Sequence, residues 1–200
     1  MVYVYKFHIE LVGLEKKMWR DMEVSSNYTV AQLGYANMAS YCGKACHLFN
    51  IKFRDKRYEI LFEPDDLEDM LGPAIDPTKV KLASLDMHIG ETMTMEYDYG
   101  AGWEWTIRLV GISEMKKGTG KHYPYVIDGA GRGILEDTSV HELTGVIEKI
   151  DETGKPIEYF DLEDGKLRWD YRVCYPMEYD SLFKWDVKRI QEAYETPIEE

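Results

Sequence analysis

The feature that most constrains the fold is a pair of alternating apolar and polar runs on either side of a short glycine turn. Apolar or aromatic residues occupy every second position from 93 to 99 and again from 103 to 109, around Gly100-Ala101-Gly102. An apolar residue at every second position predicts a strand with one buried face, and two such runs around a glycine turn predict a hairpin. The chain is therefore expected to bury one face of an antiparallel sheet.

The rest of the chain repeats this pattern and adds isolated helices. Similar alternation predicts hairpins within residues 3–24, 47–62 and 157–173. Capping boxes, in which Thr29 precedes Gln32 and Ser139 precedes Glu142, predict helices over residues 29–41 and 139–154. Helical spacing of apolar residues predicts a further helix over 183–194, and residues 64–73 are expected to form a short helix or turn.

These elements define the expected fold class. Hairpins mixed with isolated helices, without strict strand–helix alternation, favour an α+β fold with a mostly antiparallel sheet, a helix after the first hairpin and a C-terminal helix. We expect a single domain over residues 1–200, with residues 155–178 as a hairpin insertion. The glycine-rich stretch from Lys116 to Asp137 is expected to be a long surface loop.

Charge and composition exclude several classes of protein. The chain has 24 Lys and Arg against 37 Asp and Glu, a net charge of −13, and the excess of acid lies after residue 60. Such a balance repels phosphate, so bare nucleic acid is not an expected partner. No apolar run reaches the length of a membrane span, and the first residues lack the pattern of a secretory signal. With three cysteines, too few for a disulfide framework, we expect a cytoplasmic protein.

Two cysteines and a histidine close together in the sequence raise the question of a metal site. Cys42, Cys46 and His47 offer thiol and imidazole donors that zinc prefers, but their spacing is not that of a zinc finger or ribbon. Buried free thiols are the expected role of the cysteines. His47 opens a strand, so a hydrogen-bonded core histidine is its expected role.

Other motifs are incomplete. The run Asp128-Gly129-Ala130-Gly131-Arg132-Gly133 lacks the Lys-Ser/Thr of a phosphate loop and the alternating oxygen ligands of an EF-hand, so we interpret it as a flexible glycine loop. No nucleophile-elbow motif is present. The tryptophans are expected to be core or groove anchors. In particular, we expect Trp19 to be at least partly buried beside the helix of residues 29–41, with Arg20 on the opposite face.

The carboxylates form the candidate site. Clustered carboxylates can hold a divalent cation or act as a general acid and base. If residues 100–102 are the entire loop of the central hairpin, Asp98 faces Glu104 across it. The proposed ligand-binding residues are Asp98, Glu104, Asp128, Glu136, Asp137, His47 and Trp103. No cofactor is required by these residues, although a divalent cation is compatible with them.

An ordered set of motifs resembles the plasmid pRiA4b ORF-3-like family. Its three parts lie within Tyr5–Phe53, at Tyr97-Asp98-Tyr99-Gly100-Ala101-Gly102-Trp103-Glu104, and from Tyr123-Pro124 through Asp128-Gly129 to Glu136-Asp137, with Tyr179-Asp180 and Phe183 similar to the family's closing helix. The chain departs from the family pattern at Gly34, Ala101 and Trp105, which replace a histidine, an acid and a histidine. The resemblance implies mobile-element neighbours and no established chemistry.

Three functional hypotheses follow. The first is a non-enzymatic binding or interaction module of mobile-element or accessory-gene type with a protein partner, because no catalytic constellation is complete. The second is a divalent-metal-dependent hydrolase that uses the carboxylate cluster. The third is an acidic DNA-mimicking inhibitor, which requires the net charge of −16 in residues 61–200 to form one acidic face.

Overall fold

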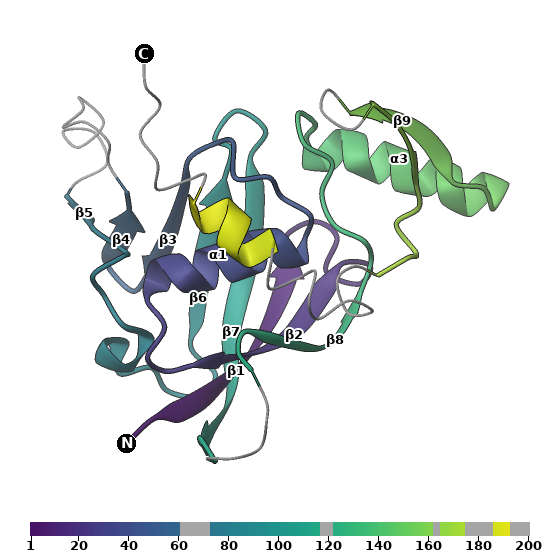
Figure 1. The fold of residues 1–200 in the computed structure, drawn as a ribbon. Coiled ribbons are helices and arrows are strands. Elements are labelled where there is room, and N and C mark those ends of the chain that lie inside the picture. Colours follow the sequence, from purple (N-terminus) through teal and green to yellow (C-terminus); the bar gives the residue numbers. More distant parts are fainter. Residues whose placement is uncertain (61–72, 117–121, 162–164, 175–185, 193–200) are drawn as a thin grey trace.

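The fold is an eight-stranded, mostly antiparallel sheet with the helix of residues 30–40 on one face, and a further helix and a small hairpin to one side (Figure 1). This computed structural model describes residues 1–60, 73–116, 122–161, 165–174 and 186–192. The strand order of the large sheet is β5-β4-β3-β6-β7-β1-β2-β8, and every neighbouring pair is antiparallel except β4 and β5. The expected α+β class is confirmed.

The elements have the following bounds. The strands of the large sheet are β1 (Tyr3–Leu11), β2 (Trp19–Ser25), β3 (Phe49–Phe53), β4 (Lys56–Glu59), β5 (Ala74–Ile75), β6 (Thr92–Tyr97), β7 (Trp103–Glu114) and β8 (Tyr125–Ala130). The helices are α1 (Val30–Ser40), α3 (Val140–Thr153) and a 3₁₀ turn at Leu82–Leu85, and residues 186–192 are also helical. The separate hairpin is β9 (Ile157–Asp161) and β10 (Gly165–Trp169). The stretches predicted at 64–72, 175–178 and 179–183 lie outside the described residues.

The predicted hairpins and caps are confirmed. β1 pairs with β2, β3 with β4 and β6 with β7, as the alternation of apolar residues predicts. Thr29 and Gln32 form a reciprocal capping box at the start of α1, and Ser139 and Glu142 do the same for α3. These side chains satisfy backbone N–H groups that a helix start leaves free, so the helices begin where the sequence indicates.

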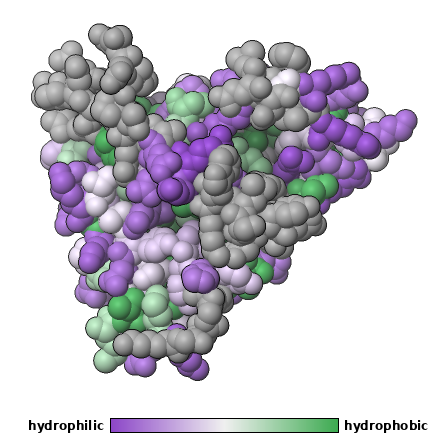
Figure 2. Space-filling model, in the orientation of Figure 1, coloured by the Kyte–Doolittle hydropathy of each residue, from purple (hydrophilic) through white to green (hydrophobic). Residues whose placement is uncertain are grey.

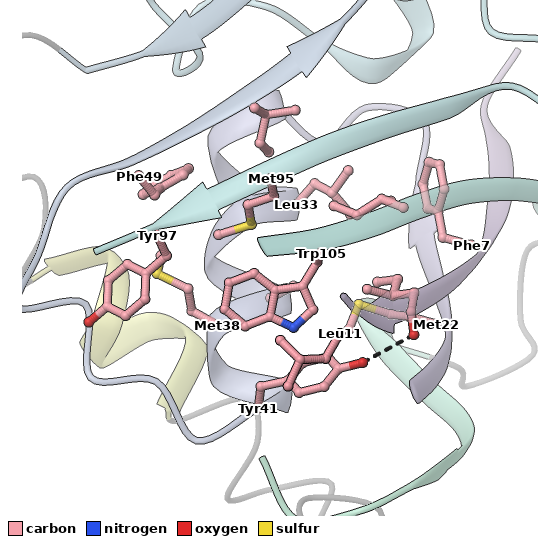
Figure 3. Close-up of a cluster of buried hydrophobic side chains, with 14 of the residues drawn as sticks. Phe7, Leu11, Met22, Leu33, Met38, Tyr41, Phe49, Met95, Tyr97 and Trp105 are labelled. Carbon is pink, nitrogen blue, oxygen red and sulfur yellow. Dashed lines mark hydrogen bonds between the residues drawn. The ribbon is translucent and has the colours of Figure 1, made fainter. Parts of the chain in front are cut away.

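Helix α1 packs tightly on the sheet. Its small residues allow this approach: a Cβ atom added at Gly34 would stand 2.5 Å from the ring of Phe49 on β3. Below the helix, Trp105 is fully buried and meets the ring of Tyr41 edge-on, with 5.5 Å between the ring centroids. Figure 3 shows Tyr97, Trp105 and Tyr41 together with apolar side chains from α1 and the sheet. The core therefore lies between α1 and one face of β3, β6, β7 and β1.

Trp19 is partly buried and Arg20 lies on the opposite face, as expected, but the prediction that Trp19 packs beside α1 is wrong. Trp19 lies on the outer face of β2, half-buried, with its ring 5.5 Å from that of His8. Arg20 points inward and is fully buried. The alternation itself requires this, because Arg20 shares a face with Met22 and Val24, both of which are buried. The two residues are on opposite faces, but the charged one faces the core.

The buried guanidinium of Arg20 joins three parts of the chain. Its Nε donates to the Ser40 carbonyl at the C-terminus of α1 at 2.9 Å, and the cation lies 4.5 Å from the centre of the Tyr41 ring. Its two amino groups donate to four more carbonyls, at Trp19, Ala130, Gly131 and Arg132, over 2.6–2.9 Å. Carbonyl dipoles at a helix C-terminus stabilise a nearby cation. Arg20 therefore ties the segment after β8 to β2 and α1.

The glycine-rich stretch is an ordered strand and a packed segment, which corrects the expected flexible loop. Residues 125–130 form β8 on β2, and the glycines beyond it touch other backbones. A Cβ atom at Gly131 would stand 2.5 Å from the Lys17 carbonyl oxygen, and one at Gly133 would stand 2.1 Å from that of Tyr41. Glycine is required here because two backbone segments of the chain approach more closely than any side chain allows.

The region after this segment forms a small satellite unit. Leu143, Ile147 and Ile150 are the buried stripe of α3, and Trp169 on β10 is also buried. Lys17 in the β1–β2 turn forms an ion pair with Asp151 on α3. The hairpin expected within residues 155–178 is present as β9 and β10.

The visible surface is mainly hydrophilic, with apolar residues in small separate areas (Figure 2). In the part of the chain that the structure describes, none of the helices combines the length and apolarity needed to cross a membrane.

A substitution at Gly133 tests the packed segment. Gly133→Ala should destabilise the fold by about 1–3 kcal/mol or more, because φ is +145° there and the new methyl group meets the Tyr41 carbonyl. Gly145→Ala in α3 is the matched control, since no atom lies within 4 Å of its Cβ position, and it should stabilise by about 0.5–1 kcal/mol. Urea denaturation measures both, and a neutral Gly133→Ala would contradict the packing.

The inward position of Arg20 gives a second test. Arg20→Met should lower the free energy of unfolding by about 3 kcal/mol or more, because several buried carbonyls lose their donor at about 1–3 kcal/mol each. Trp19→Ala should lower the free energy of unfolding by less than Arg20→Met, since Trp19 lies half-buried on the outer face. Thermal and urea unfolding compare the two, and a larger loss for Trp19→Ala would show that our orientation of β2 is wrong.

Candidate functional site

Two turns meet at one end of the sheet. Phe49 at the start of β3 pairs with Tyr97 at the end of β6, so the residues before Phe49 and after Tyr97 come together. The Asp98 N–H continues the ladder by donating to the Leu48 carbonyl at 3.0 Å. This pairing places His47, from the α1–β3 loop, next to Asp98, from the β6–β7 turn.

A third segment reaches the same place from β8. After the residues held by Arg20, the Ile134 N–H donates to the Tyr41 carbonyl at 2.8 Å. Glu136 then accepts a hydrogen bond from the Lys44 N–H. It also accepts one from the Tyr97 hydroxyl, which lies 3.1 and 3.2 Å from the two carboxylate oxygens. Its side chain is thus buried against the α1–β3 loop and the end of β6, although the next residue, Asp137, is exposed.

A thiol, an imidazole and a carboxylate converge here. One donor atom from each of Cys46, His47 and Glu136 lies within 4.8 Å of the others, and we call these three residues the donor cluster. The Cys46 Sγ is 3.8 Å from Glu136 Oε2. The His47 Nε2 is 3.6 Å from Asp98 Oδ2 and 3.8 Å from Asp137 Oδ1. The donor types are those that bind transition-metal ions.

Burial controls the protonation of this cluster. Burial raises the pKa of Glu136 above its usual value, against the opposing effect of the Lys44 and Tyr97 hydrogen bonds. Burial and the adjacent Glu136 carboxyl raise the pKa of Tyr97, so its hydroxyl remains a donor. Burial also raises the pKa of the Cys46 thiol. Burial therefore shifts each of these groups toward its protonated form, relative to the same side chain in water.

The backbone around the donor cluster is unusual. Cys42, Ala45, Asp98 and Asp137 all have positive φ values, between 52° and 60°, without being glycine. Such conformations cost free energy and are concentrated at functional sites. At Asp98 the cost is offset in part, because Oδ1 accepts hydrogen bonds from the N–H groups of Gly100 and Ala101 at 3.1 and 3.2 Å.

The turn at Asp98 changes the predicted register. Tyr97 pairs with Trp103 and Glu96 with Glu104, so the loop spans residues 98–102 and the expected pairing of Asp98 with Glu104 is wrong. The physical reason is the left-handed conformation of Asp98, whose side chain caps the turn and makes the residue part of the loop. Glu104 therefore opposes Glu96 on the outer face of the sheet.

The remaining candidate residues divide into three places. His47, Asp98, Glu136 and Asp137 lie together at the donor cluster. Asp128 lies on β8 opposite Asp21, on a strand separated from β6 by β7, β1 and β2. Trp103 is fully buried on the inner face. The structure therefore brings together four of the candidates and leaves Glu104, Asp128 and Trp103 apart from them.

Cysteine roles also differ from expectation. Cys46 is exposed rather than buried and belongs to the donor cluster, whereas Cys42 lies apart from it, with Sγ 3.6 Å from the Arg132 carbonyl. Burial raises the pKa of Cys42 to about 11. The trio Cys42, Cys46 and His47 is not a single site, because Glu136 takes the place of Cys42. Only the adjacency of Cys46 and His47 in the sequence signalled this site.

A groove of about 770 Å³ lies beside the donor cluster, on the outer face of β3, β4, β6 and β7. Its lining includes Asp98 and the row Asn50, Glu96 and Glu104, which the strand register places side by side. A polar network crosses it: the Asn50 amide donates to Glu96 at 2.9 Å and to the Tyr99 hydroxyl at 3.0 Å. We call this surface the outer-face groove.

Comparison with known proteins supports the fold. The sequence profile of the family described as plasmid pRiA4b ORF-3-like protein matches residues 3–169. A crystal structure of a protein of unknown function from Methanosarcina mazei Go1 is similar, with a TM-score of 0.67 and 24% sequence identity over 84% of this chain and 98% of that chain. No curated protein matches the chain. The likeness to the archaeal protein establishes a shared fold.

Proposed function

Because the chain belongs to the plasmid pRiA4b ORF-3-like family, which brings no established chemistry, we propose its function from the outer-face groove. The chain acts as a non-catalytic interaction module, of the mobile-element or accessory-gene type that the family name suggests. Its groove binds a basic segment of a partner protein. The observation that carries this proposal is the unbalanced carboxylate of Glu104.

Glu104 stands directly opposite Glu96 on neighbouring strands. Like charges in this position are destabilising. Glu96 is compensated, since Lys52 forms an ion pair with it at 2.8 Å and Asn50 donates a hydrogen bond to it. Partial burial raises the pKa of Glu96, but these two contacts outweigh burial and hold the pKa below its usual value. Within the described residues Glu104 forms no ion pair, so its carboxylate lacks a cation that a ligand could supply.

The floor of the groove also lacks a hydrogen-bond donor. Asn50 is 3% exposed, and its Oδ1 has no hydrogen-bond partner in the part of the chain that the structure describes. A buried acceptor without a donor costs free energy, and a ligand N–H group would remove that cost. A lysine or arginine side chain supplies both the charge and the N–H groups that this floor requires.

The basic side chains that line the groove do not prevent a basic ligand from binding. Three of the four are paired with acids, Lys52 with Glu96 at 2.8 Å, Arg54 with Glu91 at 2.9 Å and Arg57 with Glu59. At long range, the net charge of −13 attracts basic partners and speeds their encounter. Charge complementarity is thus present both in the groove and in the whole chain.

Binding of a synthetic peptide tests the proposal. A labelled extended peptide of alternating Lys and Ser should bind, while the matched Glu–Ser peptide should not, as measured by fluorescence anisotropy. Glu104→Gln should weaken the Lys–Ser peptide about tenfold, equivalent to about 1.4 kcal/mol, because it removes the carboxylate that receives the cation. The variant should remain folded, since it removes a repulsive contact.

The matched control is Glu148→Gln on the exposed surface of α3, which makes the same change in net charge. It should leave the affinity nearly unchanged. Equal weakening by both variants would mean that the affinity depends only on the net charge of the chain, and would contradict a groove site. Hydrolysis of a phosphoester or peptide that is lost in Asp98→Ala would contradict the non-catalytic role.

A further inference from the structure

The donor cluster has a composition that the outer-face groove does not explain. Cys46 and His47 are adjacent in the α1–β3 loop, and Glu136 lies 90 residues after Cys46. Hard cations such as Mg²⁺ and Ca²⁺ prefer oxygen ligands alone, whereas thiolate, imidazole and carboxylate together suit zinc and related transition-metal ions. The chemistry of the three side chains therefore selects one class of ligand.

The spacing of the donor atoms fits the same class. Zinc binds sulfur, nitrogen and oxygen at about 2.0–2.3 Å, so two tetrahedral ligands are separated by about 3.6 Å. The Cys46 Sγ is 3.8 Å from Glu136 Oε2. The His47 Nε2 is 3.6 Å from Asp98 Oδ2 and 3.8 Å from Asp137 Oδ1. The separation of Cys46 and Glu136 is close to one edge of such a tetrahedron, and a donor atom of His47 lies within 4.8 Å of both.

One donor atom lacks a hydrogen-bond partner. The His47 Nε2 is shielded from solvent and has no hydrogen-bond partner in the described part of the chain, although two carboxylate oxygens lie just beyond hydrogen-bond distance. A buried ring nitrogen in this state costs free energy. Coordination to a cation between His47 and the carboxylates would give Nε2 a partner and balance the charges around it.

The carboxylate of the cluster is oriented before any ligand binds. The Lys44 N–H and the Tyr97 hydroxyl both donate to Glu136, and Tyr97 also lies 3.6 Å from the Cys46 Sγ. Hydrogen bonds of this kind to a ligating carboxylate are typical of metal sites and fix the direction of its oxygens. Tyr97 thus contacts two of the three donor side chains.

We propose that Cys46, His47 and Glu136 form a binding site for a divalent transition-metal ion of the zinc type. Three protein ligands leave a fourth position for water or another ligand. The carboxylates of Asp98 and Asp137 lie 3.6 and 3.8 Å from the His47 Nε2. Binding replaces the S–H bond of Cys46 with a sulfur–metal bond and releases the proton to solvent, so no electron transfer is involved. The inference is independent of the ligand of the outer-face groove.

Cobalt titration of the full chain tests the site. After treatment with chelator, the chain should bind one equivalent of Co²⁺ and show the near-ultraviolet charge-transfer band of a thiolate–cobalt bond. Cys46→Ser should abolish this band, and Glu136→Gln should weaken binding at least about tenfold. Because Cys46 is exposed, Cys46→Ser should keep the circular dichroism spectrum of the native chain.

Cys42→Ser is the matched control, since Cys42 lies in the same loop region but outside the donor cluster. It should retain the band, and Zn²⁺ should raise the melting temperature of the native chain and of Cys42→Ser but not of Cys46→Ser. The proposal is overturned if the native chain shows no band, or if the band survives in Cys46→Ser. It is also overturned if the band is lost in Cys42→Ser while that variant remains folded.

Discussion

The buried guanidinium of Arg20 is the interaction on which the rest of this structure depends. A fully buried cation is stable only if its N–H groups are satisfied, and five hydrogen bonds to backbone carbonyls do this. Those carbonyls belong to β2, to the end of α1 and to the segment after β8. The fold of the sheet edge and the path of residues 130–136 are therefore determined together, and that path ends at Glu136.

Local features of the fold could be predicted from the sequence because they depend on neighbours in the chain. The alternation of apolar residues predicted the hairpins, and the two capping boxes predicted the starts of α1 and α3. The same alternation already placed Arg20 with Met22 and Val24. Our expectation that Trp19 packs beside α1 was wrong because it gave the size of the indole ring more weight than the register of the strand.

The site could be predicted only in part, because long-range contacts build it. His47, Asp98, Glu136 and Asp137 meet, but Asp128 does not, since β8 pairs with β2 at the far edge of the sheet. The path from Asp128 to Glu136 depends on Arg20 and on backbone contacts at Gly131 and Gly133, which no local pattern reveals. The left-handed conformation of Asp98 similarly decided the register of the central hairpin.

The central claim is that the segment after β8 is held against the α1–β3 loop, so that Glu136 meets Cys46 and His47. Two hydrogen bonds donated by backbone amides report this directly, from the Ile134 N–H to the Tyr41 carbonyl and from the Lys44 N–H to the Glu136 carboxylate. Amide hydrogen exchange of Ile134 and Lys44, measured by NMR on the native chain, tests both. We predict that each amide exchanges at least about a hundredfold more slowly than in an unfolded chain. Exchange of both amides at the unfolded rate would contradict the account, because the donor cluster could not then be assembled.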